Sequence, residues 1–183
     1  MANEKRMDCV LLGLLSHEEM TGYEIKKRLD TRLRLFWNAS YGSIYPTLNQ
    51  LEKDGCVTKT AILENGRNKK IYSITEKGRK RLREWIEKPV VKDEFRYETL
   101  LKLFFGSNIG EDITMEHIHR FKANVERELP FLKKSVQQLK EDDSEDAHKY
   151  FMLTALFGVK VYETYLEWCK EVESVLKGGK RNV

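Results

Sequence analysis

One short segment of the chain brings together hydrogen-bonding side chains at a spacing that would let them act together. Ser43, Tyr45, Asn49, Gln50 and Lys53 fall between two apolar stretches of the sequence. Hydroxyl, amide and ammonium groups of this kind bind phosphate oxygens and the exposed edges of bases. The chemistry that this segment suggests is recognition of a polyanion, and not the making or breaking of bonds.

The other reactive residues do not form a catalytic or metal-binding pattern. His117 and His119 are two residues apart, so on a helix they point in different directions and cannot bind one metal ion. The acidic run at 141–146 is typical of a solvated turn and of the charges at a helix start. The cysteines are odd in number and far apart, which favours reduced and buried thiols: Cys9, Cys56 and Cys169. We therefore expect neither an enzyme nor a bound metal or cofactor.

The segment with the polar residues has the periodicity of an amphipathic helix. Projected at about 100° per residue, Ile44, Leu48 and Leu51 form one inward stripe, and the polar residues lie on the other side together with Pro46. A proline is tolerated in the first turn of a helix, so Pro46 is expected to mark its start. Taken alone, such a face could also be an ordinary solvated surface.

The flanking sequence predicts the elements that would position this helix. A buried helix is expected at 7–15, and a second one opens at Thr21, where Glu24 completes a capping box, and runs to about Arg32. The third helix ends at Asp54-Gly55. A hairpin then spans residues 56–74 around Asn65-Gly66.

A fourth helix is predicted from Thr75 to just before Pro89, with Leu82, Trp85 and Ile86 facing inward. Three helices, a hairpin and a further helix follow the order of a winged helix-turn-helix. The hairpin tip is basic, and in this fold it would lie along a groove or its phosphates. Residues 1–89 hold 18 Lys and Arg against 12 Asp and Glu, so the excess positive charge lies in this half of the chain.

The second half of the chain is predicted to be helical throughout, with segments at 95–105, 112–140 and 146–177; Pro130 either kinks the middle segment or opens a new one. The last segment has two adjoining apolar strips, which is more than one packing face needs. One strip can pack on its own chain and the other on a second subunit. The residues expected at this dimer contact are Phe151, Ala155, Gly158, Tyr162, Tyr165, Trp168, Cys169 and Val172.

We therefore predict a mainly α fold with a small β-hairpin wing. It comprises an N-terminal winged helix-turn-helix at 1–89 and a C-terminal all-α dimerisation domain at 90–183. No apolar run is long enough to cross a bilayer and no signal peptide is evident, so we expect a cytoplasmic protein.

Several motifs resemble the PadR-like family of transcriptional regulators, in its longer branch with an extended helical tail. They are Leu11-Leu12-Gly13-Leu14-Leu15, Thr21-Gly22-Tyr23-Glu24-Ile25, Phe36-Trp37, Gly42-Ser43-Ile44-Tyr45-Pro46-Thr47-Leu48, Leu51-Glu52-Lys53-Asp54-Gly55, Tyr72-Ser73-Ile74-Thr75-Glu76-Lys77-Gly78 and Trp85. The resemblance implies a homodimer that binds a partly palindromic operator in double-stranded DNA and usually represses transcription. Some relatives release DNA on binding phenolic acids or drugs.

Combined with the polar helix face and the basic hairpin tip, the resemblance predicts which residues contact DNA. They are Tyr23, Tyr41, Ser43, Tyr45, Pro46, Thr47, Asn49, Gln50, Lys53, Arg67, Asn68, Lys69 and Lys70. A small aromatic effector would bind among aromatic residues, for which Trp37, Tyr97 and Trp168 are the candidates, although no sequence motif for such a ligand is present. The alternative is a winged-helix module that binds an acidic protein instead of specific DNA.

Overall fold

The computed structural model describes residues 6–33, 37, 41–64, 67–90, 93, 96–141 and 146–178, and the side chains of Tyr41, Glu64, Arg67 and Asp146 lie outside that description. The chain forms two compact units, Met1–Asp93 and Glu94–Val183, and each is described by itself. Among the helices of the described residues, none combines the length and the apolar character that crossing a bilayer requires.

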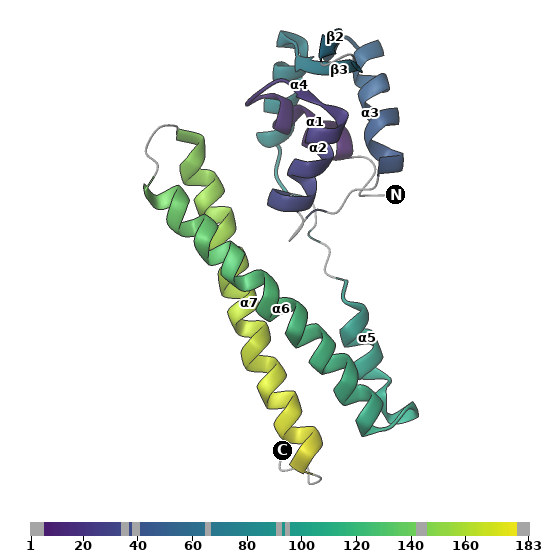
Figure 1. Cartoon of the computed structure of the whole chain (residues 1–183), viewed down its shortest axis with the longest axis vertical. Coiled ribbons are helices and arrows are strands. Elements are labelled where there is room, and N and C mark those ends of the chain that lie inside the picture. Colours follow the sequence, from purple (N-terminus) through teal and green to yellow (C-terminus); the bar gives the residue numbers. More distant parts are fainter. Residues whose placement is uncertain are drawn as a thin grey trace. The chain divides into compact units, whose positions relative to one another are not determined.

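The first unit is a winged helix-turn-helix, as the sequence predicts (Figure 1). Its elements follow in the order α1 (Met7–Leu15), β1 (Met20–Thr21), α2 (Gly22–Arg28), a π-helical turn η2 (Leu29–Leu33), α3 (Tyr41–Lys53), β2 (Val57–Glu64), β3 (Arg67–Ile74) and α4 (Glu76–Ile86). Strands β2 and β3 pair antiparallel from Val57 opposite Ile74 to Glu64 opposite Arg67. The predicted hairpin is therefore confirmed, while its Asn65-Gly66 turn lies outside the described residues.

The sheet has one strand more than the sequence predicts. Residues Met20 and Thr21 pair antiparallel with Tyr72 and Ile71 of β3, which gives a three-stranded sheet in the order β1-β3-β2. A segment of two residues is too short to show the alternating pattern that predicts a strand. It forms a strand because the neighbouring strand pairs with it. Thr21 is therefore both the second residue of β1 and the N-cap of α2.

The predicted starts of α2 and α4 are confirmed in atomic detail. Thr21 and Glu24 form the capping box of α2, with the Glu24 amide donating to Thr21 Oγ1 at 3.2 Å and the Thr21 amide donating to Glu24 Oε2 at 2.7 Å. At the start of α4, Thr75 Oγ1 accepts from the Gly78 amide at 3.1 Å. The α-helical part of α2 ends at Arg28 and not near Arg32, and the following turn is π-helical.

Pro46 lies deeper in α3 than predicted. The helix begins at Tyr41, so Pro46 belongs to its second turn and does not mark its start. At that depth the missing proline N–H leaves the Gly42 carbonyl without its usual partner four residues on. Both residues are exposed, so water can reach this carbonyl.

A single apolar core holds the first unit together. Its fully buried members come from α1, α2, η2, α3 and β2, and include Leu11, Leu12, Ile25, Leu29, Ile44, Leu48, Leu51 and Val57. Helix α4 contributes Leu82, as predicted, but Trp85 and Ile86 are 39% and 64% exposed. Leu82 lies beside Gly13 of α1, whereas the last turn of α4 does not reach the core.

All the regular elements in the described part of the second unit are helical. It contains α5 (Glu98–Phe104), a short 3-10 turn η3 (Gly106–Asn108), and the two long helices α6 (Glu111–Glu141) and α7 (Asp146–Gly178), which pack against each other (Figure 1). Helix α6 continues through Pro130, which therefore does not open a new segment. Leu129 and Val136 of α6 form a buried cluster with Val159 of α7.

Candidate nucleic-acid interface

Helix α3 has the two faces that the sequence predicts. Ile44, Leu48 and Leu51 are buried in the core. On the opposite side, one exposed stripe contains Gly42, Tyr45, Pro46, Asn49, Gln50 and Lys53. These side chains offer a hydroxyl, two amides and an ammonium group, and no carboxylate stands among them. We call these six residues the α3 stripe.

Two residues that were predicted to contact DNA, Ser43 and Thr47, lie between the α3 stripe and the core and are only partly exposed. Thr47 is partly buried, and its Oγ1 donates to the carbonyl of Ser43 at 2.7 Å, within the same helix. Its hydroxyl proton is therefore already engaged, and its oxygen remains as an acceptor. Ser43 is also only partly exposed. Tyr41 begins α3, but its side chain lies outside the described residues.

A network of charged groups fixes the C-terminal end of α3. Asp54 Oδ1 accepts from the Gln50 amide at 2.8 Å, and Asp54 Oδ2 accepts from Arg81 at 3.1 Å. Arg81 also bonds Asp8 of α1, so α1, α3 and α4 meet in this network. The Gln50 hydrogen bond, and then Arg81, lower the pKa of the Asp54 carboxyl. Because a carboxylate only accepts, Gln50 turns its amide nitrogen to Asp54 and keeps its carbonyl for another partner.

Two wing residues that were predicted to contact DNA, Asn68 and Lys70, lie on the hairpin face that is bonded to α3. Residues Lys59, Ala61 and Leu63 alternate onto one face of β2, and Lys59 bonds Glu52 of α3. Lys70 stands opposite Ala61 and Asn68 opposite Leu63, so both share this face. Lys69 pairs with Ile62 on the other face, together with Arg67, whose side chain lies outside the described residues.

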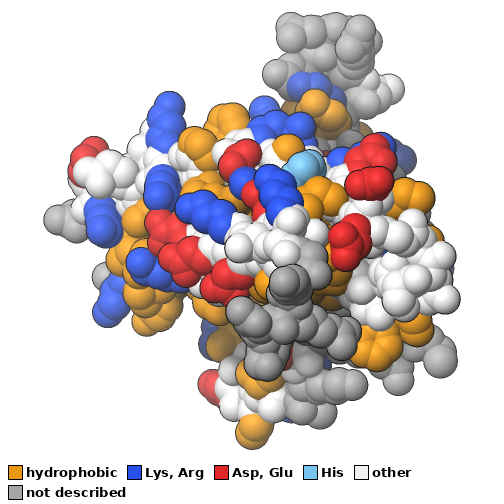
Figure 2. Space-filling view, turned by 90° about the horizontal axis from the view of Figure 1, so that it is seen from below, with side chains coloured by type: hydrophobic (Ala, Val, Ile, Leu, Met, Phe, Trp, Pro, Cys, Tyr) orange, Lys and Arg blue, Asp and Glu red, His pale blue; other side chains and the backbone are white. Residues whose placement is uncertain are grey.

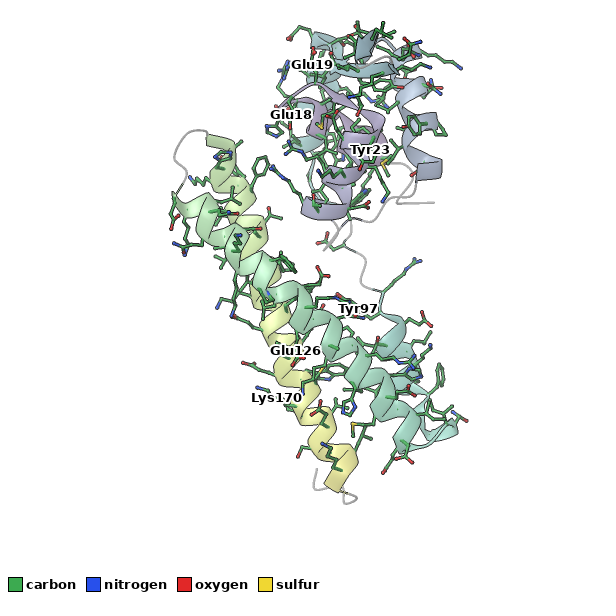
Figure 3. All side chains as sticks on the ribbon, in the orientation of Figure 1. Glu18, Glu19, Tyr23, Tyr97, Glu126 and Lys170 are labelled. Carbon is green, nitrogen blue, oxygen red and sulfur yellow. The ribbon has the colours of Figure 1, made fainter. Side chains whose placement is uncertain are left out.

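The sequence prediction missed Leu63, which is 75% exposed beside Asn68. The signal available in the sequence was strand alternation, because Leu63 lies an even number of residues after the buried Val57 and therefore points to the same face of the strand. Tyr23, in the first turn of α2, is 65% exposed, so its ring is available to a partner (Figure 3).

The residues predicted at the dimer contact are mostly occupied within the chain. Gly158 and Cys169 are buried, and Ala155 and Tyr162 pack against the cluster that α6 and α7 share. The remaining members, Phe151, Tyr165, Trp168 and Val172, are partly buried. The large apolar residues of α7 that are exposed in the single chain are not among those predicted, and they are Tyr150, Leu153, Phe157 and Val175.

Two of the three candidate effector residues lie in one aromatic cluster. Phe121 of α6 contacts both Tyr97 and Trp168, with ring centroids 6.2 and 5.9 Å apart. The Tyr165 hydroxyl donates to the Tyr97 hydroxyl at 2.6 Å, and burial, followed by this contact, raises the pKa of Tyr165. Tyr97 also lines an open hollow of about 480 Å³ with Arg96, Glu98 and Leu101. Trp37 belongs to the first unit, where it packs on the core, and its buried Nε1 has no hydrogen-bond partner among the residues that the structure describes.

The described residues contain no group of three or more His, Cys, Asp or Glu that could hold a metal ion. The three cysteines are free and buried, as expected from the sequence. Burial raises the pKa of Cys9 to about 11, which keeps this thiol protonated at neutral pH.

Comparison with known proteins covers both units. Residues 11–84 match the model of the Transcriptional regulator PadR-like family, and residues 95–177 match that of the Virulence activator alpha C-term. The Negative transcriptional regulator PadR of Bacillus subtilis is 29% identical over 170 residues, which cover 86% of this chain and 91% of that protein.

Two solved structures have the same architecture along nearly their whole length. The smu.1604c protein of Streptococcus mutans superimposes with a TM-score of 0.79 at 32% identity, covering 90% of this chain and 96% of that one. The structure of Bacillus subtilis PadR in complex with operator DNA gives a TM-score of 0.77 at 23% identity, covering 92% of this chain and 98% of that one. Together with the winged first unit and the helical second unit, these matches show that the chain belongs to the PadR-like family of transcriptional regulators.

Proposed function

We propose that the protein is a dimeric repressor that binds a partly palindromic operator and inserts α3 into the major groove of each half-site. The observation that carries this proposal is the α3 stripe, which exposes hydrogen-bonding groups and a lysine while the opposite face of the same helix is fully buried. Asn49 and Gln50 contact base edges, and Tyr45 and Lys53 contact the backbone. The 29% identity to a negative transcriptional regulator supports repression as the output.

The wing adds contacts that do not depend on base sequence. Asn68 and Lys70 reach the phosphates beside the groove that α3 occupies, on the hairpin face that bonds α3 through Lys59 and Glu52. Lys69 adds positive charge from the other face of the same strand.

Dimerisation uses the uncovered strip of α7. Tyr150, Leu153 and Phe157 follow helical spacing on one side, and each is between 49% and 65% exposed. Apolar side chains also stand between charged ones on the face shown in Figure 2. An exposed apolar strip of this kind is typical of a protein contact. A two-fold contact then presents two copies of α3 to half-sites about one helical turn of DNA apart.

A small aromatic effector is proposed to act through the cluster around Tyr97. The hollow is lined by Arg96, Tyr97, Glu98 and Leu101. Arg96 and the Tyr97 ring are the groups that would bind an aromatic carboxylate, while the carboxylate of Glu98 is paired with Lys102 at 2.9 Å. Binding there would lower operator affinity only if the ligand prefers a dimer arrangement that does not fit DNA. Titration of hydroxycinnamic acids into the protein–DNA complex, followed by anisotropy, tests this part separately.

Selection of bound sequences from a random DNA pool tests the main proposal. We expect enrichment of a site with two related halves, and gel shifts on this site at physiological salt. If the protein is a protein-interaction module, the selection should enrich no sequence, and gel shifts should show no preference for any DNA. That outcome would replace the repressor with the alternative of an acidic protein partner.

A further inference from the structure

Gly22, the first residue of α2, lies directly under the ring of Tyr45. Gly22 is buried. A Cβ atom placed on it would be 2.6 Å from Tyr45 Cε1 and 2.8 Å from both Cζ and the hydroxyl oxygen. Favourable contacts between carbon atoms lie at roughly 3.5 to 4.0 Å. No side chain larger than hydrogen fits at this position while the Tyr45 ring stays where it is.

The backbone conformation does not require glycine here. The glycines with positive φ in the described part of the chain are Gly55 and Gly110, and Gly22 is not among them. Alanine is favoured over glycine by about 1 kcal/mol in a helix interior, and at the first helical position, which Gly22 occupies, helix propensity gives glycine no advantage either. The missing side chain is therefore explained by the space that the Tyr45 ring occupies.

The surface under the ring is held rigidly from both sides. The preceding residue, Thr21, pairs with Ile71 of β3 and is the N-cap of α2. The Thr21–Glu24 hydrogen bonds then fix the first turn of α2. Tyr45 itself is 44% exposed, with one side on Gly22 and the remainder facing outward from the α3 stripe.

We propose that Gly22 is a positioning residue for DNA binding: it provides the flat backbone surface that sets the direction of the Tyr45 ring and hydroxyl. This inference rests on the proposed function. Gly22 does not itself touch DNA and acts through Tyr45. Gly22→Ala displaces the ring, and the loss of one hydrogen bond from the tyrosine to a phosphate in each half-site, at about 10-fold each, corresponds to about a 100-fold drop in the affinity of the dimer.

A double-mutant cycle with Gly22→Ala and Tyr45→Ala tests the inference. Affinity for a site selected from the random pool is measured by anisotropy for the wild type, both single variants and the double variant. Gly22→Ala should cost the dimer about 100-fold in the wild-type background and less than about 2-fold when Tyr45 is already alanine. Gly13→Ala is the matched control, because its new Cβ would lie 4.0 Å from Leu82 Cδ1, an ordinary contact, and it should bind like the wild type.

Each outcome has a definite meaning. Equal loss from Gly22→Ala in both backgrounds, or no loss in the wild-type background, overturns the positioning role while leaving the proposed function intact. A wild type that enriches no DNA site rejects the proposed function itself. If Gly22→Ala does not fold, Tyr45→Ala and the double variant, both free of the clash, must bind equally, and a difference between them refutes the inference. Urea unfolding of all variants separates lost stability from lost affinity.

Discussion

Removing the charge of Lys70 should reduce the salt dependence of operator binding by a defined amount. Lys70 is exposed on β3, opposite Ala61, on the hairpin face that is tied to α3. A lysine that neutralises one phosphate contributes about 0.9 to the slope of log affinity against log salt concentration. Because the proposed dimer has two copies, Lys70→Ala should lower the magnitude of this slope by about 1.8.

This slope translates into an effect that anisotropy measures easily. Between about 50 and 200 mM salt, a slope difference of about 1.8 is roughly a 12-fold difference in affinity loss. The wild type should therefore lose about 12-fold more affinity over this interval than Lys70→Ala does. The assay is a titration of labelled operator at several salt concentrations, with the dimer population checked at each.

Lys80→Ala provides the control, since Lys80 is equally charged and exposed but lies on α4, beside Glu84. It should leave the slope nearly unchanged. Parallel lines for Lys70→Ala and the wild type would show that the wing does not touch phosphates. An equal change for Lys80→Ala would show that only the net charge of the unit matters.

Three further predictions concern the dimer, the N-cap of α4 and the network at the end of α3. Phe157→Glu places a charge on the uncovered strip of α7, so it should shift the sedimenting species from dimer to monomer and weaken operator binding, while Lys134→Glu on α6 should not. Thr75→Ala removes the N-cap of α4 and should lower the free energy of unfolding by about 1 kcal/mol, measured by urea titration; an unchanged value would contradict the capping role. Asp54 has a pKa below its ordinary value of 3.8, so the carboxylate stabilises the fold above that pH and the contribution is lost as the pH falls through the lowered pKa. Asp54→Asn should therefore be less stable than the wild type at pH 7 and indistinguishable from it in acid, and a difference that does not change with pH would refute this account.

Local chemistry explains which parts of the fold could be predicted from sequence. The caps at Thr21 and Thr75 depend on residues three positions away, and the inward stripe of Ile44, Leu48 and Leu51 depends only on helical period. The hairpin followed from the Asn-Gly pair between two β-prone runs. These features are set by neighbours in the chain, so tertiary structure did not alter them.

The features that sequence could not predict depend on partners far away in the chain. Strand β1 is two residues long and forms because β3 offers a free edge. Trp85 and Ile86 follow the spacing of Leu82, but the core ends before they can reach it. The position of Gly22 shows the same limit, because only the folded structure brings the Tyr45 ring over it.

Helix α7 illustrates a limit of a different kind. Its two apolar strips adjoin, and periodicity gives both the same weight. Packing against α6 covers the strip with Gly158 and Val159 and leaves Phe157 outside. Gly158 is buried there as well. The choice between strips therefore depends on the shape of α6, which the sequence of α7 does not contain.

The electrostatics of α3 also depend on distant residues. The two carboxylates at its C-terminal end, Glu52 and Asp54, would repel a phosphate chain if they stood alone. Each has a cationic partner from another element: Lys59 of β2 bonds Glu52, and Arg81 of α4 bonds Asp54. The outward surface that remains at this end is set by Lys53 and by the carbonyl of Gln50. Lys59 of the wing and Arg81 of α4 thus offset the negative charge at the end of α3, which is why the polar pattern of α3 alone was insufficient to distinguish an interface from a solvated helix.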